Sequence, residues 1–302
     1  MQLGMIGLGR MGANMTLRLL RGEHTLAVYD RDPEAARALQ AEGAVPCDSI
    51  KALVAALDRP RHVWVMVPSG NPVTETIAEL AKHLDKGDCI IDGGNSYYKD
   101  SVVRSQGLEK GGIYYMDVGT SGGVWGLANG YCLMIGGPPA IFERLKPIFE
   151  TLAPPDGYAH VGPAGAGHYV KMVHNGIEYG MLEAYAEGFE LLNASTYDLD
   201  LHQVSSLWNQ GSVVRSWLLE LAERALANDP SLEQIAGYVE DSGEGRWAVL
   251  EAIERDVPAT VLAYSLFARF RSRQKESFGA KLIAALRNEF GGHGTRKAED
   301  GS

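Results

Sequence analysis

The pattern of apolar and polar residues divides the chain into two halves of different character. In the first half, short apolar runs alternate with amphipathic stretches whose apolar residues recur every three or four positions. The apolar runs predict strands at residues 2–7, 25–29, 62–67, 89–92, 113–118, 131–135 and 158–161. The amphipathic stretches predict helices that include residues 14–21, 33–41, 72–84 and 140–151. This alternation is typical of a doubly wound, largely parallel sheet.

The second half, from about residue 165, carries no strand signal and repeats the helical period. It predicts helices at residues 165–192, 201–210, 213–227, 245–255, 258–271 and 276–290. A turn-forming segment, Gly162-Pro163-Ala164-Gly165, separates the two halves. We therefore expect an α/β fold, in which a Rossmann-type doubly wound sheet (residues 1–164) is followed by an all-α helical domain (residues 165–302).

The long helix predicted at residues 165–192 carries polar side chains along one face. Five of them lie at helical positions i, i+3, i+4, i+7 and i+8, namely Lys171, His174, Asn175, Glu178 and Tyr179. The apolar residues on the remaining faces are expected to pack, namely Val170, Met172, Val173, Ile177 and Met181. An exposed helix can carry such a polar face for solubility alone. This face, however, combines a potential base, an acid and three hydrogen-bonding groups, so we expect it to hold and deprotonate a polyhydroxy substrate.

Composition narrows the possible partners. The 302 residues carry a formal net charge of −10 and no basic run, which disfavours nucleic acid and membranes, so an anionic substrate needs a local cluster of cations. Cys47, Cys89 and Cys132 are widely spaced and indicate thiols in a reducing compartment rather than a metal site. The chain begins directly on a strand and has no apolar run of the length that spans a membrane. We expect a cytoplasmic protein without a metal.

A dinucleotide-binding fingerprint follows the first predicted strand. The segment Gly7-Leu8-Gly9-Arg10-Met11-Gly12 has the G-x-G-x-x-G spacing. The first glycine permits the tight turn, the second lets a pyrophosphate approach the backbone, and the third allows the helix to pack closely on the strand. The second predicted strand ends at Asp30, eighteen residues beyond Gly12, where the ribose-binding acid belongs.

The residues at the end of the second strand also bear on the choice of cofactor. The carboxylate of Asp30 can accept hydrogen bonds from the ribose 2′-hydroxyl and would repel a 2′-phosphate, whereas Arg31 can stack on adenine or partly offset that repulsion. We expect NAD, with NADP as a secondary cofactor. Val67 and Pro68 end the third predicted strand at the carboxyl edge of the sheet, where loops line the nicotinamide side of such crevices.

Three further segments combine with the polar helix face and make the chain recognisable. They are Asp92-Gly93-Gly94-Asn95-Ser96, the loop Ser121-Gly122-Gly123, and Arg287-Asn288-Glu289-Phe290-Gly291-Gly292-His293. Together with GLGRMG and GAGHYVKMVHNGIEYG, and in the same order along nearly the whole chain, they closely resemble the decarboxylating 6-phosphogluconate dehydrogenases in their short bacterial form. The helix motif is highly specific, whereas GLGRMG alone indicates only a β-hydroxyacid dehydrogenase.

The resemblance implies oxidative decarboxylation of 6-phospho-D-gluconate to D-ribulose 5-phosphate and CO₂, a reaction of the pentose phosphate pathway or of gluconate utilization. Lys171 matches the family's general base and Glu178 its general acid. Asn175 and His174 match hydrogen-bonding groups that orient the substrate, as do Asn95, Ser121, Gly122 and Gly123. Asn95 is expected to bind the cofactor as well. A lysine that acts as a base must be neutral at least transiently, which burial beside a positively charged nicotinamide favours.

The resemblance also implies which residues bind the substrate phosphate. Tyr179, Arg269 and Arg287 match the family's phosphate ligands, and the guanidinium group suits bidentate binding of phosphate. Arg287 and His293 come from a neighbouring subunit in the family, which implies a homo-oligomer, a dimer or a tetramer, whose helical domain both binds substrate and oligomerises. The family's longer enzymes have a phosphate-binding lysine where this chain has Ser242, and a threonine at Glu244; Arg246 is a candidate to compensate.

Two other functions stay open at this point. A related β-hydroxyacid dehydrogenase, of the 3-hydroxyisobutyrate type, shares the glycine fingerprint, the loop at Ser121 and a Lys-x-x-x-Asn pair, but it does not need Tyr179, Arg269 or the C-terminal segment. A catalytically inactive dinucleotide-binding protein is the other alternative. Such a protein would be expected to have lost Lys171 or Glu178, and both residues are present.

Overall fold

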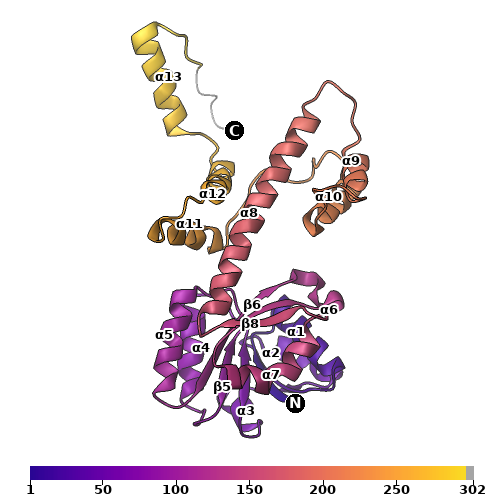
Figure 1. The fold of residues 1–302 in the computed structure, drawn as a ribbon, viewed down its shortest axis with the longest axis vertical. Helices are drawn as coiled ribbons and strands as arrows, with labels where there is room; N and C mark the ends of the chain where they lie inside the picture. The colour runs from indigo at the N-terminus through magenta and orange to yellow at the C-terminus, as the bar shows by residue number, and fades with distance from the viewer. Residues whose placement is uncertain (297–302) are drawn as a thin grey trace. The chain divides into compact units, whose positions relative to one another are not determined.

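The computed structural model describes residues 1–296 and divides the chain into two compact units (Figure 1). The first unit extends from Met1 to Gly176, and the second begins at Ile177. The helix α8 (Ala166–Asn193) runs through this division. The domain boundary expected between residues 164 and 165 therefore stays a prediction.

The first unit is built on one eight-stranded sheet in the order β3-β2-β1-β4-β5-β6-β7-β8. Its strands are β1 (Gln2–Ile6), β2 (Thr25–Tyr29), β3 (Val45–Pro46), β4 (His62–Val65), β5 (Cys89–Asp92), β6 (Tyr114–Ser121), β7 (Cys132–Gly136) and β8 (Tyr158–Gly162). All neighbouring strands pair in parallel except β6 and β7, which are antiparallel. The expected fold class, a Rossmann-type sheet followed by helices, is confirmed.

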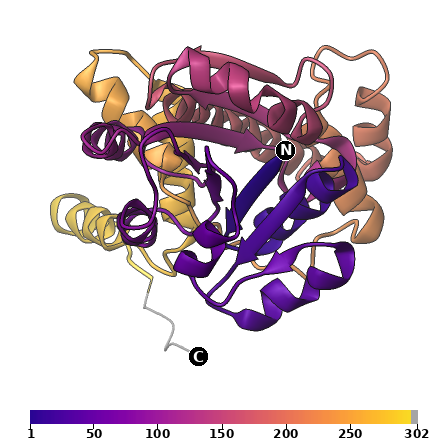
Figure 2. The same ribbon diagram turned by 90° about the horizontal axis from the view of Figure 1, so that it is seen from below.

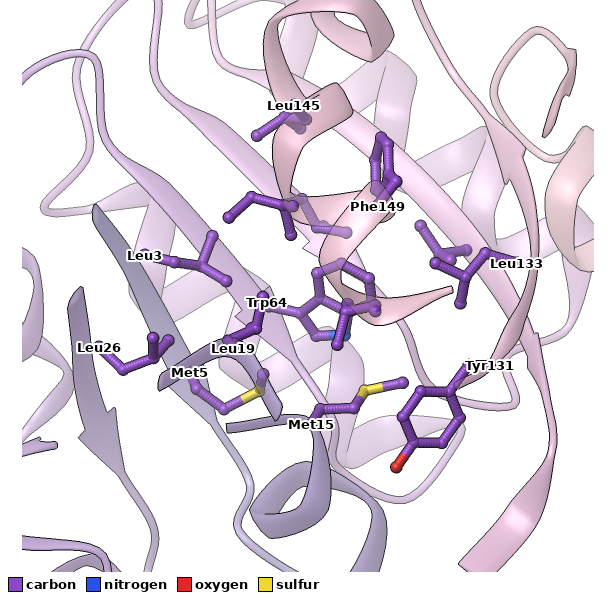
Figure 3. Close-up of a cluster of buried hydrophobic side chains, with 14 of the residues drawn as sticks. Leu3, Met5, Met15, Leu19, Leu26, Trp64, Tyr131, Leu133, Leu145 and Phe149 are labelled. Atoms are coloured by element: carbon purple, nitrogen blue, oxygen red, sulfur yellow. The ribbon is translucent and has the colours of Figure 1, made fainter. Parts of the chain in front are cut away.

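Helices cover both faces of this sheet (Figures 1 and 2). One buried apolar cluster lies between the sheet and the helices α1 (Arg10–Arg21), α2 (Pro33–Ala38) and α7 (Pro139–Leu152), and Figure 3 shows it around Trp64. A second cluster lies between the sheet and α3 (Ile50–Ala55), α4 (Asn71–Ala81) and α5 (Tyr98–Glu109). The sheet is thus buried on both sides, as its nearly continuous apolar strands predict.

The differences from the predicted elements have local causes. The strand β3 has only two residues, one of them Pro46, and such a segment gives no periodic signal. The helix α5 gives a weak amphipathic signal because its buried side carries Ser101 and Arg104 beside Leu108. Short turns complete the first unit: η1 (Gln40–Glu42), η2 (Gly123–Trp125) and α6 (Gly126–Asn129).

All the secondary-structure elements described in the second unit are helices. After the end of α8 come α9 (Leu201–Trp208), α10 (Trp217–Asn228), α11 (Glu244–Glu254), α12 (Thr260–Ser272) and α13 (Phe278–Gly291). α9 packs on α10, and α11 packs on α12. Among residues 1–296, no helix is both long and apolar enough to cross a membrane.

The expected packing residues of α8 show the largest departure from the sequence analysis. Met172 is buried, but Val170, Val173, Ile177 and Met181 are 38%, 37%, 53% and 38% exposed. The expectation that these four pack within the chain is therefore wrong. The periodicity identified a continuous apolar face correctly, but it carries no information about what covers that face.

Candidate active site

The glycine fingerprint forms the turn between β1 and α1. Gly7 has a φ of +89°, a conformation that favours glycine, and its N–H donates to the Tyr29 carbonyl at 3.0 Å. A Cβ on Gly12 would lie 1.9 Å from the Gly7 carbonyl oxygen, so α1 can begin this close to the strand only with glycine there. A Cβ on Gly9 would meet no protein atom within 4 Å, which leaves the backbone of this residue accessible to a ligand.

A cavity of about 700 Å³ lies in front of this turn, within the first unit. Ten of the eleven residues expected to bind a dinucleotide line it: Gly7, Gly9, Arg10, Met11, Gly12, Asp30, Arg31, Val67, Pro68 and Asn95. The eleventh, Leu8, is buried, and its N–H donates to Oδ2 of Asp30 at 2.6 Å. Open space at Gly9, a helix N-terminus at the turn and a carboxylate at the end of β2 together fit a dinucleotide.

The carboxylate of Asp30 is fixed by two backbone N–H groups. Its Oδ2 accepts from Leu8 in the glycine turn, and its Oδ1 accepts from Asp32 at 2.9 Å. Each oxygen has a further lone pair for a ligand hydroxyl. Asp30 thereby ties the end of β2 to the glycine turn.

The contribution of α4 to the cavity wall was not predicted from the sequence. Glu75, Thr76 and Glu79 lie on its inner side, with Pro72 at its start and Ser69 before it. Glu79 accepts hydrogen bonds from Lys82 and His83, which lower its pKa. Its position along the chain could have indicated this contribution, because α4 follows the carboxyl end of β4 and such sheets bind ligands at that edge.

The first turns of α8 bring the proposed base against β6. Lys171 is 8% exposed, and a Cβ on Gly119 of β6 would lie only 2.4 Å from the Lys171 Cβ. The helix is held at its start by Asp117, whose Oδ1 accepts from the Gly165 N–H at 2.7 Å and whose Oδ2 accepts from the His168 N–H at 2.9 Å. A buried carboxylate therefore caps the helix that carries Lys171.

One turn further along α8, three predicted substrate residues meet. The His174 ring nitrogens lie 3.4 Å from the Ser121 hydroxyl and 2.9 Å from the Asn175 side-chain oxygen. Gly122 and Gly123, with φ values of +127° and +52°, continue this loop beyond Ser121. The first unit thus brings Lys171, His174, Asn175 and Ser121 together, whereas Asn95 lines the dinucleotide cavity.

A second group of predicted residues gathers around Tyr179 in the second unit. The Tyr179 hydroxyl accepts from the Ser242 N–H at 3.2 Å, and the Arg269 guanidinium carbon lies 3.5 Å from the centre of the ring. Arg269 also donates to the Glu240 carbonyl at 2.9 Å. A Cβ on Gly245 would lie 2.4 Å from the Tyr179 ring, so α11 approaches it only because residue 245 is glycine. Stacking on Tyr179 and the bond to Glu240 together fix the direction of the Arg269 guanidinium.

The segment that departs from the family pattern lies beside this group. The Ser242 hydroxyl donates to Glu244 at 2.6 Å, and Glu244 is 1% exposed. Arg246 donates from Nε and Nη2 to Asp241 at 2.6 and 3.1 Å, and Arg273 donates to the same carboxylate at 2.6 Å. These bonds, that of Arg246 first, lower the pKa of Asp241. Arg246 is thus engaged by Asp241, and its role in place of the family lysine stays a prediction.

The remaining predicted residues are exposed or further along the helix. Glu178 lies on α8 seven positions after Lys171, on the face that their helical spacing defines. Arg287, near the end of α13, and His293, just beyond it, are exposed. Among residues 1–296, no three His, Cys, Asp or Glu side chains are grouped as a metal site, and the three cysteines are free thiols.

Two family models and several known proteins match this chain. A family model described as the NAD binding domain of 6-phosphogluconate dehydrogenase matches residues 2–162, and one described as the 6-phosphogluconate dehydrogenase C-terminal domain matches residues 167–300. YqeC of Bacillus subtilis is 45% identical over 98% of this chain and 100% of its own length. The NAD(+)-dependent, decarboxylating 6-phosphogluconate dehydrogenase of Haloferax volcanii is 44% identical over 99% of this chain and 100% of its own length.

A solved structure supports the same assignment. The 6-phosphogluconate dehydrogenase of Plasmodium falciparum superposes with a TM-score of 0.83 at 31% identity, over 96% of this chain. This chain covers 65% of that longer protein, and covers YqeC and the Haloferax protein in full.

Proposed function

The chain belongs to the 6-phosphogluconate dehydrogenase family, and we propose that it converts 6-phospho-D-gluconate into D-ribulose 5-phosphate and CO₂ with NAD as hydride acceptor. The observation that carries this proposal is the polar face of α8, where Lys171 and Asn175 are each only 8% exposed although apolar residues of the helix such as Val173 and Ile177 are exposed. A buried lysine on such a face suits proton transfer to and from a bound substrate.

NAD fits the cavity of the first unit. Bound there, NAD would supply the acceptor for the hydride that leaves C3 of the substrate. The Asp30 carboxylate is in place to accept hydrogen bonds from the ribose 2′-hydroxyl, while a 2′-phosphate there would meet a like charge. NAD is also the cofactor named for the Haloferax relative, whereas NADP appears with the Plasmodium enzyme.

Lys171 serves as the general base in this proposal. It takes the proton of the substrate C3 hydroxyl as the C3 hydride leaves, which gives a 3-keto acid. Protonated, it then stabilises the negative charge that develops on the ketone oxygen while the carboxylate departs as CO₂. Its burial against β6 at Gly119 fixes the position of the amine through its stem.

Glu178 completes the reaction by protonating the carbon of the enediol that decarboxylation leaves. It lies two helical turns beyond Lys171, so one helix carries both proton-transfer groups. His174, Asn175, Ser121, Gly122, Gly123 and Asn95 orient the hydroxyl and carboxylate groups of the substrate. The contacts of His174 with Ser121 and Asn175 support this assignment because they hold the imidazole in one orientation.

The substrate phosphate binds at Tyr179 and Arg269. Arg269 is oriented by the Tyr179 ring and by the Glu240 carbonyl, which leaves the fork of the guanidinium preorganised for an anion. A second copy of the chain supplies Arg287 and His293, so the protein acts as a homo-oligomer. The exposed apolar side chains of α13 support this, because Phe278 and Phe290 are 80% and 77% exposed, which is costly unless a partner covers them.

Two variants test these roles. Lys171→Met should abolish hydride transfer and leave NAD binding unchanged, and near-normal turnover would exclude Lys171 as the base. Mixing Lys171→Met chains with Arg287→Ala chains should restore part of the activity if each site takes residues from two copies. Mixed oligomers that form but remain inactive would refute the sharing of sites.

A further inference from the structure

The segment that leads into α11 is tied to the neighbouring helices of the second unit. The Val239 N–H donates to the Ser272 hydroxyl on α12 at 3.0 Å. The Asp241 side chain is 4% exposed, and its carboxylate accepts from Arg246 on α11 and from Arg273 at the end of α12, each at 2.6 Å. Residues 239–241 are therefore held in one position relative to both helices.

Ser242 continues this segment and makes two hydrogen bonds of its own. Its N–H donates to the Tyr179 hydroxyl oxygen at 3.2 Å, and its hydroxyl donates to Oε2 of Glu244 at 2.6 Å. Ser242 is exposed, whereas Glu244 is 1% exposed and lies in the first turn of α11. A carboxylate is stabilised at the start of a helix by the helix dipole, so Glu244 offers Ser242 a fixed acceptor.

The Tyr179 hydroxyl keeps a proton for which residues 1–296 provide no acceptor. Tyr179 is 4% exposed, and buried hydroxyls normally use their protons in hydrogen bonds. Because the Ser242 N–H occupies an acceptor position on this oxygen, the hydroxyl proton points away from Ser242. The ring is held by the Arg269 guanidinium over its face and by the close approach of Gly245. A fixed ring with an unpaired hydroxyl proton indicates a hydrogen-bond donor for a ligand.

We propose that Ser242 and Glu244 are positioning residues, which hold the Tyr179 hydroxyl so that its proton is donated to the phosphate of the substrate. The proposal rests on the proposed function in that Tyr179 and Arg269 bind this phosphate. Neither Ser242 nor Glu244 needs to contact the phosphate, because both act through Tyr179. An oriented neutral donor thereby serves the site at which the longer enzymes of the family have a lysine.

Four substitutions separate this role from a merely structural one. Ser242→Ala removes the bond to Glu244 and keeps the backbone N–H, and Glu244→Ala removes the acceptor. Glu244→Gln keeps an oxygen for the Ser242 hydroxyl but loses the charge. Ser265→Ala is the matched control, since Ser265 is 1% exposed on α12 and its hydroxyl donates to the Leu262 carbonyl of the same helix at 2.9 Å.

The first measurement is the Kd for 6-phospho-D-gluconate by calorimetry without cofactor, which needs no turnover. Ser242→Ala and Glu244→Ala should each raise this Kd about fivefold, because the hydrogen bond from Tyr179 to the phosphate is less well oriented. Glu244→Gln and Ser265→Ala should stay within about twofold of the wild type. An equal rise of the Kd in Glu244→Gln and Glu244→Ala would show that the charge of Glu244 matters instead, and would overturn the proposal.

A double-variant cycle tests whether Ser242 acts through Tyr179. Tyr179→Phe alone should raise the Kd for 6-phospho-D-gluconate about tenfold or more, because a hydrogen bond to a charged group is lost. In that background Ser242→Ala should change the Kd by less than about twofold, since no hydroxyl remains to be oriented. A rise in the Tyr179→Phe background as large as in the wild-type background would overturn the proposal.

Turnover distinguishes this proposal from the proposed function. In Ser242→Ala, KM for 6-phospho-D-gluconate should rise as the Kd does, while kcat should change less and the Kd for NAD should stay the same. A wild-type protein that binds 6-phospho-D-gluconate but does not oxidise it would refute the proposed function alone. A wild-type protein that does not bind it would refute both.

Discussion

Replacement of Gly119 by alanine tests whether the position of Lys171 limits the reaction. The new Cβ would lie 2.4 Å from the Lys171 Cβ and 2.7 Å from the Gly167 carbonyl oxygen. Carbon atoms in contact are about 3.5–4.0 Å apart, so β6 and the first turns of α8 must separate by about 1 Å. Overpacking of this kind costs about 1–3 kcal/mol of stability.

The catalytic effect should exceed what this loss of stability suggests. A displacement of about 1 Å can lower the rate of an oriented reaction about a hundredfold, so we expect kcat for NAD reduction to fall by about that factor. The Kd for NAD should stay nearly unchanged, because Gly119 does not line the cofactor cavity. Both quantities are measured on folded protein, with NAD binding followed by fluorescence and turnover by NADH absorbance.

Gly188→Ala is the matched control, since a Cβ there would meet no atom within 4 Å and Gly188 lies on the same helix. It should leave kcat unchanged. A Gly119→Ala protein that binds NAD and turns over like the wild type would show that contact between β6 and α8 does not position Lys171.

Three further predictions concern other parts of the molecule. Asp30→Ala should weaken NAD binding at least about tenfold but not NADP binding, because the ribose loses an acceptor while the repulsion of a 2′-phosphate disappears; parallel titrations with both cofactors measure this. Arg269→Lys should raise KM for 6-phosphogluconate about tenfold, since an ammonium cannot stack on Tyr179 as the planar group does, while Arg271→Lys on the exposed side of α12 should not. Burial first, and then the charge of Arg144, lower the pKa of His62 from 6.5 to about 4. His62 is therefore neutral in the folded protein above about pH 4. Because this histidine binds a proton below pH 6.5 in the unfolded chain, up to about 3 kcal/mol of stability, fully present above pH 6.5, should be lost as the pH falls from 6.5 towards 4. Urea unfolding at pH 7 and pH 4.5 should show a smaller decrease in the free energy of unfolding for His62→Gln than for the wild type.

The parts of the site that depend on local spacing could be predicted from the sequence. The glycine turn, Asp30 and the first strands follow one another within about thirty residues, and each has a local signature. The polar face of α8 is equally accessible, because the helical period alone places Lys171, Asn175 and Glu178 on one side. On α8, backbone geometry alone fixes the arrangement, and at the glycine turn the pairing of the neighbouring strands β1 and β2 brings Asp30 to Leu8.

The parts that depend on tertiary contacts could not be predicted from local pattern. Tyr179 meets Ser242 and Arg269 across sixty or more positions, and only the family resemblance pointed to that group. Asp117 reads as one polar residue in a buried strand, and nothing local shows that it caps α8. Ser101 and Arg104 weaken the amphipathic signal of α5 because they serve a buried network instead of the apolar core.

NAD-dependent oxidative decarboxylation on the polar face of α8 can be tested by measuring the products formed from 6-phospho-D-gluconate. The purified protein is incubated with this substrate and either NAD or NADP, and NADH or NADPH, CO₂ and ribulose 5-phosphate are quantified together. We expect NAD to be reduced faster than NADP, with CO₂ and ribulose 5-phosphate released in amounts equal to the NADH formed. NAD binding without reduction, or reduction without release of CO₂, would contradict it.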